Sequence, residues 1–178
     1  MARVCPWWCA WFSIDNPLRL LVHDPQKIVG PYVQSGMMVL DVGWFSIPMA
    51  RLVGQQGRVV AVDLQQQMLD MLRRRAEKAR VADRIQFHKC AQDHLGVDVQ
   101  ADFALAFAMA HEVPDQRRLF REIRSCLKPS GKLLLAEPPL HVSAKTFAKE
   151  VAAAEEMGLR AAGRPHVRWS RAVVLDRT

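Results

Sequence analysis

The feature that most constrains the fold is a set of short apolar runs that are hydrophobic on both faces of an extended chain. The clearest are residues 39–43 (VLDVG), 57–64 (GRVVAVDL) and 101–110 (ADFALAFAMA). A strand of this kind must be covered on both faces, which is typical of a parallel sheet between two layers of helices. The runs are too short for membrane helices, which need roughly 20 apolar residues. They therefore favour an α/β fold with a buried sheet.

Amphipathic segments alternate with these runs and predict the helices that cover the sheet. In residues 65–80 and 115–131 the apolar residues recur at helical spacing and form one stripe on each helix. Ser46 is expected to cap the first of these helices, and Pro129 and Gly131 are expected to end the third. Upstream, Asp24 before Pro25 predicts a further helix start. The four main predicted helices are residues 47–54, 65–80, 115–131 and 142–158.

The order of strands and helices along the chain indicates a doubly wound sheet. The remaining predicted strands are residues 83–90, 132–138, 159–167 and 170–177. A short connection joins the last two strands, which suits an antiparallel hairpin. The expected fold is therefore α/β, a doubly wound, seven-stranded, mostly parallel sheet with a C-terminal antiparallel hairpin. Right-handed connections place the carboxyl ends of the parallel strands on one rim, where a ligand is expected to bind.

Composition narrows the class of protein. A chain of 178 residues, half of them hydrophobic, is long enough for one domain with a substantial core. The start of the chain lacks the cleavage site of a signal peptide, so no secretion and no membrane segment are expected. Cys5, Cys9, Cys90 and Cys126 match neither a zinc ribbon nor a redox Cys-x-x-Cys pattern. We therefore expect free thiols in the reducing cytoplasm and no metal site.

The formal net charge of +7 leaves nucleic acid open as a partner without favouring it. The arginine-rich runs at 73–80 and 117–124 fall on exposed faces of predicted helices. A solvated helix face is therefore favoured over a groove that binds RNA. The sequence leaves the oligomeric state open.

Four segments carry the strand ends: VLDVG at 39–43, VVAVDLQQQML at 59–69, CLKPSGKLLLAEP at 126–138 and the closing hairpin. In these segments the chain resembles the class I S-adenosylmethionine-dependent methyltransferases. The resemblance implies a Rossmann-like fold, S-adenosyl-L-methionine as cofactor and a small-molecule methyl acceptor. It divides the chain into a Trp-rich N-terminal extension or lid at 1–24 and a methyltransferase-like domain at 25–178. The extension could instead cover an apolar edge of the sheet or contact a partner chain.

The resemblance also implies which residues bind the cofactor. Asp63, at the end of the second strand, would accept hydrogen bonds from both ribose hydroxyls. Asp41 would face the ammonium group of the methionine portion, and Gln92 or Asp93 would accept from the amine of adenine. Asp63 could instead only cap the following helix, Asp41 could be a hydrogen-bonded strand-end acid, and Leu64 could belong to the core. The full implied set is Asp41, Gly43, Asp63, Leu64, Ala91, Gln92 and Phe107.

The glycine-rich turn of that family is shortened in this chain. The family pattern is Asp-x-Gly-x-Gly-x-Gly, whereas DVG here meets WFSIP directly, with about four residues absent. Such glycines let the backbone approach a cofactor closely and adopt positive φ. Trp44 would instead carry a bulky ring toward the methionine portion. The alternative to an active enzyme is therefore an inactive methyltransferase-like binding or regulatory module. A nicotinamide-dependent oxidoreductase ranks last, because it would not normally end in an antiparallel strand pair.

Candidate catalytic groups follow the fourth and fifth strands. Where a methyl acceptor must lose a proton, a general base is needed. His111 and Glu112 are the leading candidates for this role. Glu137 and His141 are further candidates for a base or for a group that orients the acceptor. His111 and Glu112 could instead only cap the next helix.

Overall fold

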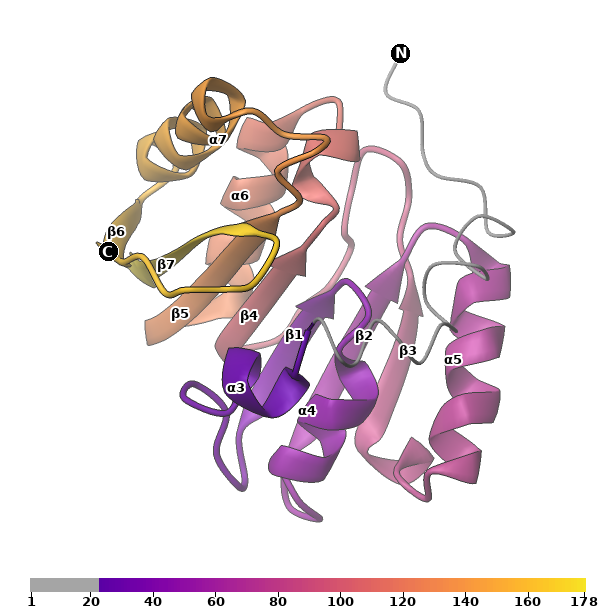
Figure 1. Ribbon diagram of the computed structural model, residues 1–178. Helices are drawn as coiled ribbons and strands as arrows, with labels where there is room; N and C mark the ends of the chain where they lie inside the picture. Colours follow the sequence, from indigo (N-terminus) through magenta and orange to yellow (C-terminus); the bar gives the residue numbers. More distant parts are fainter. Residues whose placement is uncertain (1–22) are drawn as a thin grey trace.

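A seven-stranded sheet forms the centre of the computed structural model, which describes residues 23–178 (Figure 1). The strands lie in the order β3-β2-β1-β4-β5-β7-β6. β1 to β5 pair in parallel, whereas β7 is antiparallel to both β5 and β6. The predicted sheet with its C-terminal antiparallel pair is confirmed. The strands are β1 (Met38–Val42), β2 (Arg58–Asp63), β3 (Ile85–Lys89), β4 (Ala101–Phe107), β5 (Leu127–Glu137), β6 (Leu159–Gly163) and β7 (Arg171–Arg177).

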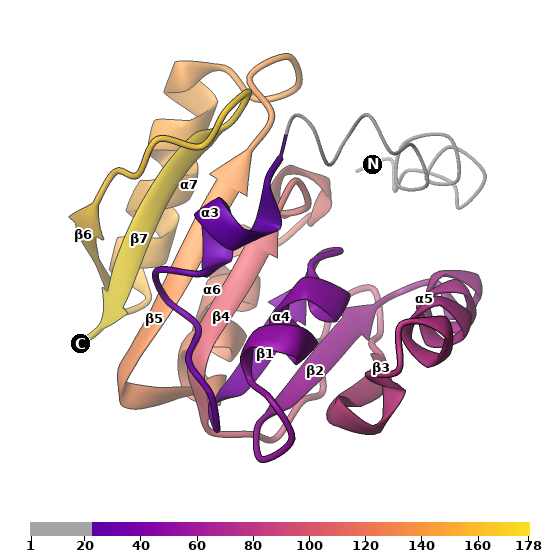
Figure 2. The same cartoon turned by 60° about the horizontal axis from the view of Figure 1, so that its bottom comes forward.

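Helices cover both faces of this sheet, as its two-sided apolar strands require (Figure 2). Helices α3 to α5 pack on one face, and α6 and α7 pack on the other. Two short 3-10 helices, η1 and η2, follow α5 and β4. The helices are α3 (Pro25–Val29), α4 (Ser46–Leu52), α5 (Gln66–Lys78), η1 (Ala82–Arg84), η2 (Ala110–Glu112), α6 (Gln116–Cys126) and α7 (Ala144–Glu156). Within residues 23–178, no helix combines the length and the apolar character needed to span a membrane.

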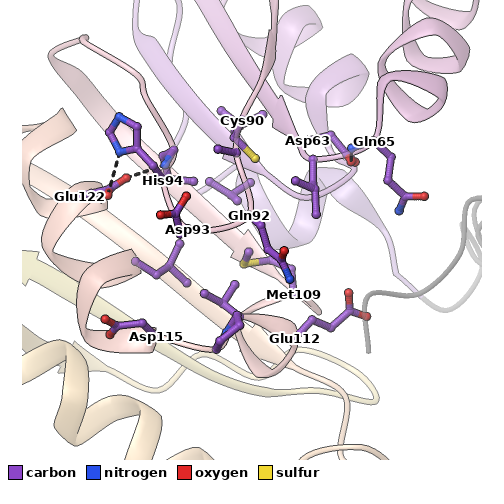
Figure 3. Close-up of a pocket in the computed structure, with 18 of the residues that line it drawn as sticks. Asp63, Gln65, Cys90, Gln92, Asp93, His94, Met109, Glu112, Asp115 and Glu122 are labelled. Carbon is purple, nitrogen blue, oxygen red and sulfur yellow. Dashed lines mark hydrogen bonds and ion pairs between the residues drawn. The ribbon is translucent and has the colours of Figure 1, made fainter. Parts of the chain in front are cut away.

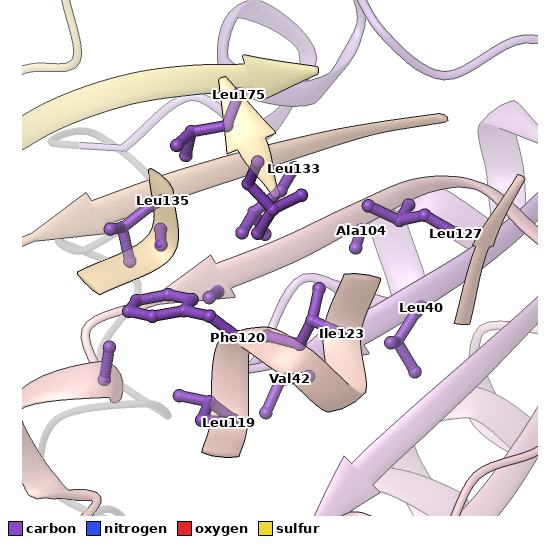
Figure 4. Close-up of a cluster of buried hydrophobic side chains, with 14 of the residues drawn as sticks. Leu40, Val42, Ala104, Leu119, Phe120, Ile123, Leu127, Leu133, Leu135 and Leu175 are labelled. Atoms are coloured by element: carbon purple, nitrogen blue, oxygen red, sulfur yellow. The ribbon is translucent and has the colours of Figure 1, made fainter. Parts of the chain in front are cut away.

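Alternate positions of each strand contribute to two separate layers of the core. Leu40 and Val42 of β1 belong to the layer beneath α6, together with Phe120 (Figure 4). Val39 belongs to the opposite layer, beneath α3 to α5. Asp41 shares the face of Val39 because side chains alternate along a strand. The carboxylate of Asp41 is therefore buried on the α4 side of the sheet.

The strand order reverses between β1 and β4. From β1 the chain moves outward to β2 and β3, and it then returns to β4 on the other side of β1. In doubly wound sheets, ligands bind outside the carboxyl ends of the strands at such a switch point. A ligand is therefore expected to bind at the loops that follow β1, β2 and β4.

The C-terminal end predicted for the helix at 115–131 is wrong. α6 ends at Cys126, and Leu127 already pairs with Ala101 as the first residue of β5. Residues 128–131, with the proline and glycine expected to end the helix, lie in an irregular stretch of that strand. The helix ends early because the following residues pair with β4. The periodicity of the local sequence does not indicate this pairing.

The cap predicted for the helix after β1 is also wrong, whereas the one before α3 is confirmed. α4 begins at Ser46 itself, with Phe45 in the N-cap position. The carboxylate of Asp24 accepts a hydrogen bond from the N–H of Gln26 at 3.0 Å, immediately before α3. The role predicted for the Trp-rich start of the chain concerns residues outside the described range, apart from His23 and Asp24.

Candidate functional site

A cavity of about 430 Å³ opens at the carboxyl ends of β1, β2 and β4, beside the loop that follows β3 (Figure 3). Its volume falls in the range of roughly 300–1,000 Å³ that is typical of small-molecule sites. Its apolar wall is formed mainly by Val42, Val62, Leu64, Leu95, Met109, Val113 and Leu119. Five carboxylates also line it, those of Asp63, Asp93, Glu112, Asp115 and Glu122.

The structure brings most of the sequence-predicted site residues to this cavity. Those that line it are Gly43, Asp63, Leu64, Ala91, Gln92 and Glu112. Asp41, Phe107 and His111 do not line it, although each lies at or just beyond the end of a strand on the same rim. The leading catalytic pair is thus divided: Glu112 faces the cavity, whereas the ring of His111 is bonded elsewhere.

Asp63 ends β2 at the cavity wall. One of its oxygens, Oδ1, accepts a hydrogen bond from the N–H of Gln65 at 2.8 Å. Gln65 is the N-cap residue of α5, and that helix receives no capping bond from its side chain. Burial raises the pKa of Asp63; the bond from Gln65 opposes the rise, and the negative charge of Glu112 adds to it. The Asp63 and Glu112 carboxylates thus interact electrostatically across the site.

Asp41 lies behind the turn after β1 and is fully buried. The hydroxyl of Ser46 donates a hydrogen bond to its Oδ2 at 2.5 Å. Burial raises the pKa of Asp41 to about 7, against the opposing effects of Ser46 and of the backbone N–H of Phe45. A side chain at Gly43 would lie 3.3 Å from Oδ1 of Asp41 and 3.5 Å from Cβ of Phe107. A residue without a side chain is therefore favoured between the cavity and this acid.

Aromatic rings fill the space beside the shortened turn. The ring centroid of Trp44 lies 4.4 Å from that of Phe45 and 6.0 Å from that of Phe107. His23 packs edge-on against Phe107 at 5.3 Å. A second cavity of about 40 Å³ lies beside Gly43 and Trp44. It has room for a few water molecules and no more.

His111 is held by a buried acid. Its Nδ1 lies 2.5 Å from Oε2 of Glu137, whose side chain has no exposed surface. The other oxygen of Glu137, Oε1, accepts from the N–H of Ala110 at 2.8 Å. The hydrogen bond with Glu137 raises the pKa of His111, although burial acts in the opposite direction. The ring of His141 lies edge-on to that of His111, at 5.8 Å between centroids.

A second buried acid, which the sequence did not single out, lies near this pair. The amide nitrogen of Gln116 donates to the carbonyl of Ala110 at 3.0 Å and to Oε1 of Glu150 at 3.1 Å. Burial raises the pKa of Glu150 to about 7, and the charge of Glu137 contributes to the rise. The only local signal was a glutamate among the apolar residues of a predicted helix.

Glu122 of α6 fixes the loop after β3 against the cavity. Its Oε2 accepts from the N–H of Leu95 at 2.6 Å, and its Oε1 lies 3.0 Å from Nδ1 of His94 and 3.1 Å from Nε of Arg118. Although burial opposes it, bonding to His94, Leu95 and Arg118 lowers the pKa of Glu122. Sequence reasoning missed this residue, although its spacing of three from Leu119 places both on one helix face.

No cluster of three or more His, Cys, Asp or Glu side chains suited to a metal ion occurs in residues 23–178. Cys90 borders the cavity, and burial raises the pKa of its thiol to about 11. The thiol is therefore protonated at neutral pH and is a poor nucleophile.

Solved structures share this fold. An S-adenosylmethionine-dependent methyltransferase from Aquifex aeolicus superposes with a TM-score of 0.83 and 22% identity, covering 96% of this chain and 98% of that one. A [4+2]-cyclase, SpnF, superposes with a TM-score of 0.70 at 15% identity, covering 84% of this chain and 79% of that one. At such identities the likeness establishes the fold and not the reaction.

Curated relatives share part of the sequence. The ubiquinone/menaquinone biosynthesis C-methyltransferase UbiE of Cellvibrio japonicus is 34% identical over 111 residues, which is 59% of this chain and 44% of that protein. The demethylmenaquinone methyltransferase of Lactobacillus johnsonii is 30% identical over 110 residues, or 59% of this chain and 45% of that protein. The chain therefore matches less than half the length of these relatives.

The family described as "Methyltransferase domain" matches residues 39–131, which is more than half of the chain. This range runs from β1 through α6 and includes every strand end that forms the cavity. The predicted family is confirmed: the chain belongs to the methyltransferase domain family.

Proposed function

We propose that the chain is an S-adenosyl-L-methionine-dependent methyltransferase that acts on a small-molecule acceptor. The observation that carries the proposal is an acid-lined cavity of small-molecule size at the switch point of a methyltransferase-family sheet. The alternatives to it are an inactive binding or regulatory module and a nicotinamide-dependent oxidoreductase.

The cavity lining fits the adenosyl portion of this cofactor. Asp63 can accept hydrogen bonds from ribose hydroxyls, which are stronger than bonds between neutral groups because its carboxylate is charged. Leu64, Ala91 and Met109 provide apolar surface for a purine ring, and Gln92 provides an amide for its polar edge. The wall carboxylates favour a ligand with positive charge.

When bound, S-adenosyl-L-methionine supplies a methyl group on a positively charged sulfur, which is already activated for transfer. The protein must then hold the acceptor in line with that methyl group, exclude water and take up a proton. Glu112, on the cavity wall, is the residue that we propose to orient the acceptor.

We propose His111, which lies outside the cavity lining but directly precedes Glu112 on the cavity wall, as the group that takes up the proton. Because Nδ1 of its ring is bonded to Glu137, the neutral ring presents Nε2 as its accepting nitrogen. The Glu137 carboxylate then stabilises the imidazolium that forms. A general base is expected to have a perturbed pKa, and the pKa of His111 is raised by its buried partner Glu137.

For the acceptor we propose the ring of a quinone precursor, because the names of the relatives refer to C-methylation in ubiquinone and menaquinone biosynthesis and to demethylmenaquinone. Methylation at a ring carbon forms a carbon–carbon bond and breaks the carbon–sulfur bond of the donor. The hydrogen on that ring carbon leaves as a proton, which His111 accepts.

Calorimetric titration of the full chain with S-adenosyl-L-methionine tests the proposal. Saturable binding in the micromolar range supports it, whereas no binding up to millimolar concentration contradicts it and favours the inactive module. Asp63→Asn should weaken binding by roughly 5- to 150-fold, which corresponds to about 1–3 kcal/mol. Asp98→Asn, at an exposed position outside the cavity lining, is the matched control and should leave affinity unchanged. Binding of NADH instead would favour the oxidoreductase.

A further inference from the structure

The charge of the cavity is opposite to that of the chain. Five carboxylates line it in a chain of net charge +7, and no lysine or arginine among residues 23–178 lines it. Arg118 lies near its edge, but its guanidinium is already 3.1 Å from Glu122 and 3.5 Å from Asp93. A ligand with positive charge is therefore favoured in this cavity, and a ligand carboxylate finds no lysine or arginine on its described walls.

The start of α4 does not provide a binding site for a ligand carboxylate either. The first N–H groups of a helix lack partners within the helix and attract negative charge. Here the N–H groups of Phe45 and Ser46 act on the carboxylate of Asp41, which also accepts from the Ser46 hydroxyl. The positive end of α4 thus acts on the protein's own buried acid.

The remaining space beside the turn is closed by side chains. Trp44, Phe45 and Phe107 pack against one another there. The small cavity beside Trp44 includes Arg75 in its wall, but at about 40 Å³ it cannot admit an amino-acid group. Neither route on this side of Gly43 offers a carboxylate both room and an exposed cation.

We propose that the cavity binds an adenosyl sulfonium by its nucleoside and its positive charges, without a site among residues 23–178 for the carboxylate of a methionine arm. The ligand class that fits best is an adenosyl sulfonium whose arm ends in an ammonium group and carries no carboxylate. This inference rests on the proposed function, because it assumes that the cavity takes an adenosyl ligand. It differs from that proposal in which end of the arm the protein recognises.

The test compares two probes on the full chain by calorimetry at one pH and one ionic strength: S-adenosyl-L-methionine and its decarboxylated form. The decarboxylated probe is expected to bind about tenfold more tightly, because it avoids placing an unpaired carboxylate near the wall acids. Its affinity should also fall more steeply with added salt, which screens the attraction between opposite charges. Tighter binding of the methionine form would overturn the inference.

A variant that removes one wall charge tests whether the carboxylates of the cavity cause the preference for the decarboxylated probe. Glu112→Gln should reduce the affinity ratio of the two probes at least threefold, toward equal binding. Glu77→Gln, at an exposed position of α5 outside the cavity lining, is the matched control and should leave the ratio unchanged. An unchanged ratio in Glu112→Gln would count against the proposed electrostatic origin.

The two proposals fail in different ways. If neither probe binds, the proposed function fails and the inference fails with it. If both bind and the methionine form binds more tightly, only the inference fails. If the decarboxylated form alone binds, the inference stands and the proposed methyl donor is wrong.

Discussion

Oε2 of Glu137 and Nδ1 of His111 lie 2.5 Å apart, which joins the last residue of β5 to the 3-10 helix after β4. Glu137 is fully buried, and its second oxygen is engaged by the N–H of Ala110. The acid is thus held on both sides, and it in turn holds the imidazole in one orientation. Such a buried carboxylate–histidine pair is costly to form, and breaking it by removing one partner is more costly still.

Glu137→Gln is expected to lower the methyl-transfer rate by one to two orders of magnitude with little change in KM, because His111 loses the charge that stabilises its imidazolium. The glutamine can still accept from Ala110, so the fold should persist. Glu137 raises the pKa of His111, so the rate should rise with pH as His111 loses its proton. In the variant this rise should shift to lower pH. A pH–rate profile that does not move would contradict the role of Glu137, and Glu77→Gln is the control.

Stability should fall as pH rises toward neutrality, because of Asp41. The folded-state pKa of Asp41 is raised from 3.8 to about 7, so folding favours its protonated form. Its stabilising contribution is therefore complete below about pH 4 and is lost as pH rises through 7, by roughly 4 kcal/mol at most. Urea unfolding of the protein and of Asp41→Asn across this range checks the sign. The variant should show a shallower pH dependence, with a remainder from Glu150; equal slopes would contradict the prediction.

Ser46→Ala should destabilise the protein by about 1–3 kcal/mol, because it leaves a buried carboxylate without its hydroxyl donor. The loss should be larger at pH 8 than at pH 5, since a hydrogen bond to a charged acceptor is stronger than one to a neutral acid. Urea unfolding at both pH values measures it. Ser130→Ala, at an exposed position, is the control, and an equal effect in the two variants would rule out a special role for Ser46.

Glu122→Ala should release the loop after β3 from α6. The N–H of Leu95 loses its acceptor, so its hydrogen exchange should accelerate by about tenfold for each 1.4 kcal/mol lost. Affinity for an adenosyl ligand should fall together with this change, because Gln92 and Ala91 lie on the same loop. Exchange at Leu95 that matches the unchanged protein would show that the loop is held by other contacts. Glu77→Ala is the control.

Local patterns predicted most of the secondary structure for a clear reason. Two-sided apolar runs marked the parallel strands, and stripes at helical spacing marked α5 and α6. Asp24 before Pro25 marked the start of α3, because a cap and the residue after it are neighbours in sequence. Boundaries failed where a distant segment decided them: α6 ends early because Leu127 pairs with Ala101.

The candidate site was predictable only in part. Residues at strand ends could be named because a parallel sheet gathers those ends on one rim, and Asp63 and Gln92 were found in this way. The partners of those residues could not be named. Nothing local indicates that Glu122 reaches Leu95, or that Glu150 lies near Glu137.

By itself the sequence determined the class of fold, the rim that carries the site and the family, because these follow from periodicity and from motifs of neighbouring residues. Only the tertiary structure decided that the Ser46 hydroxyl donates to Asp41 instead of capping a helix. It also decided that the ring of His111 is hydrogen-bonded to Glu137 and that Glu112 lines the cavity. The physical reason is that hydrogen bonds and burial depend on which segments meet in space. The pKa values of these acids depend on the same contacts between distant segments, which the spacing of residues along the chain does not encode.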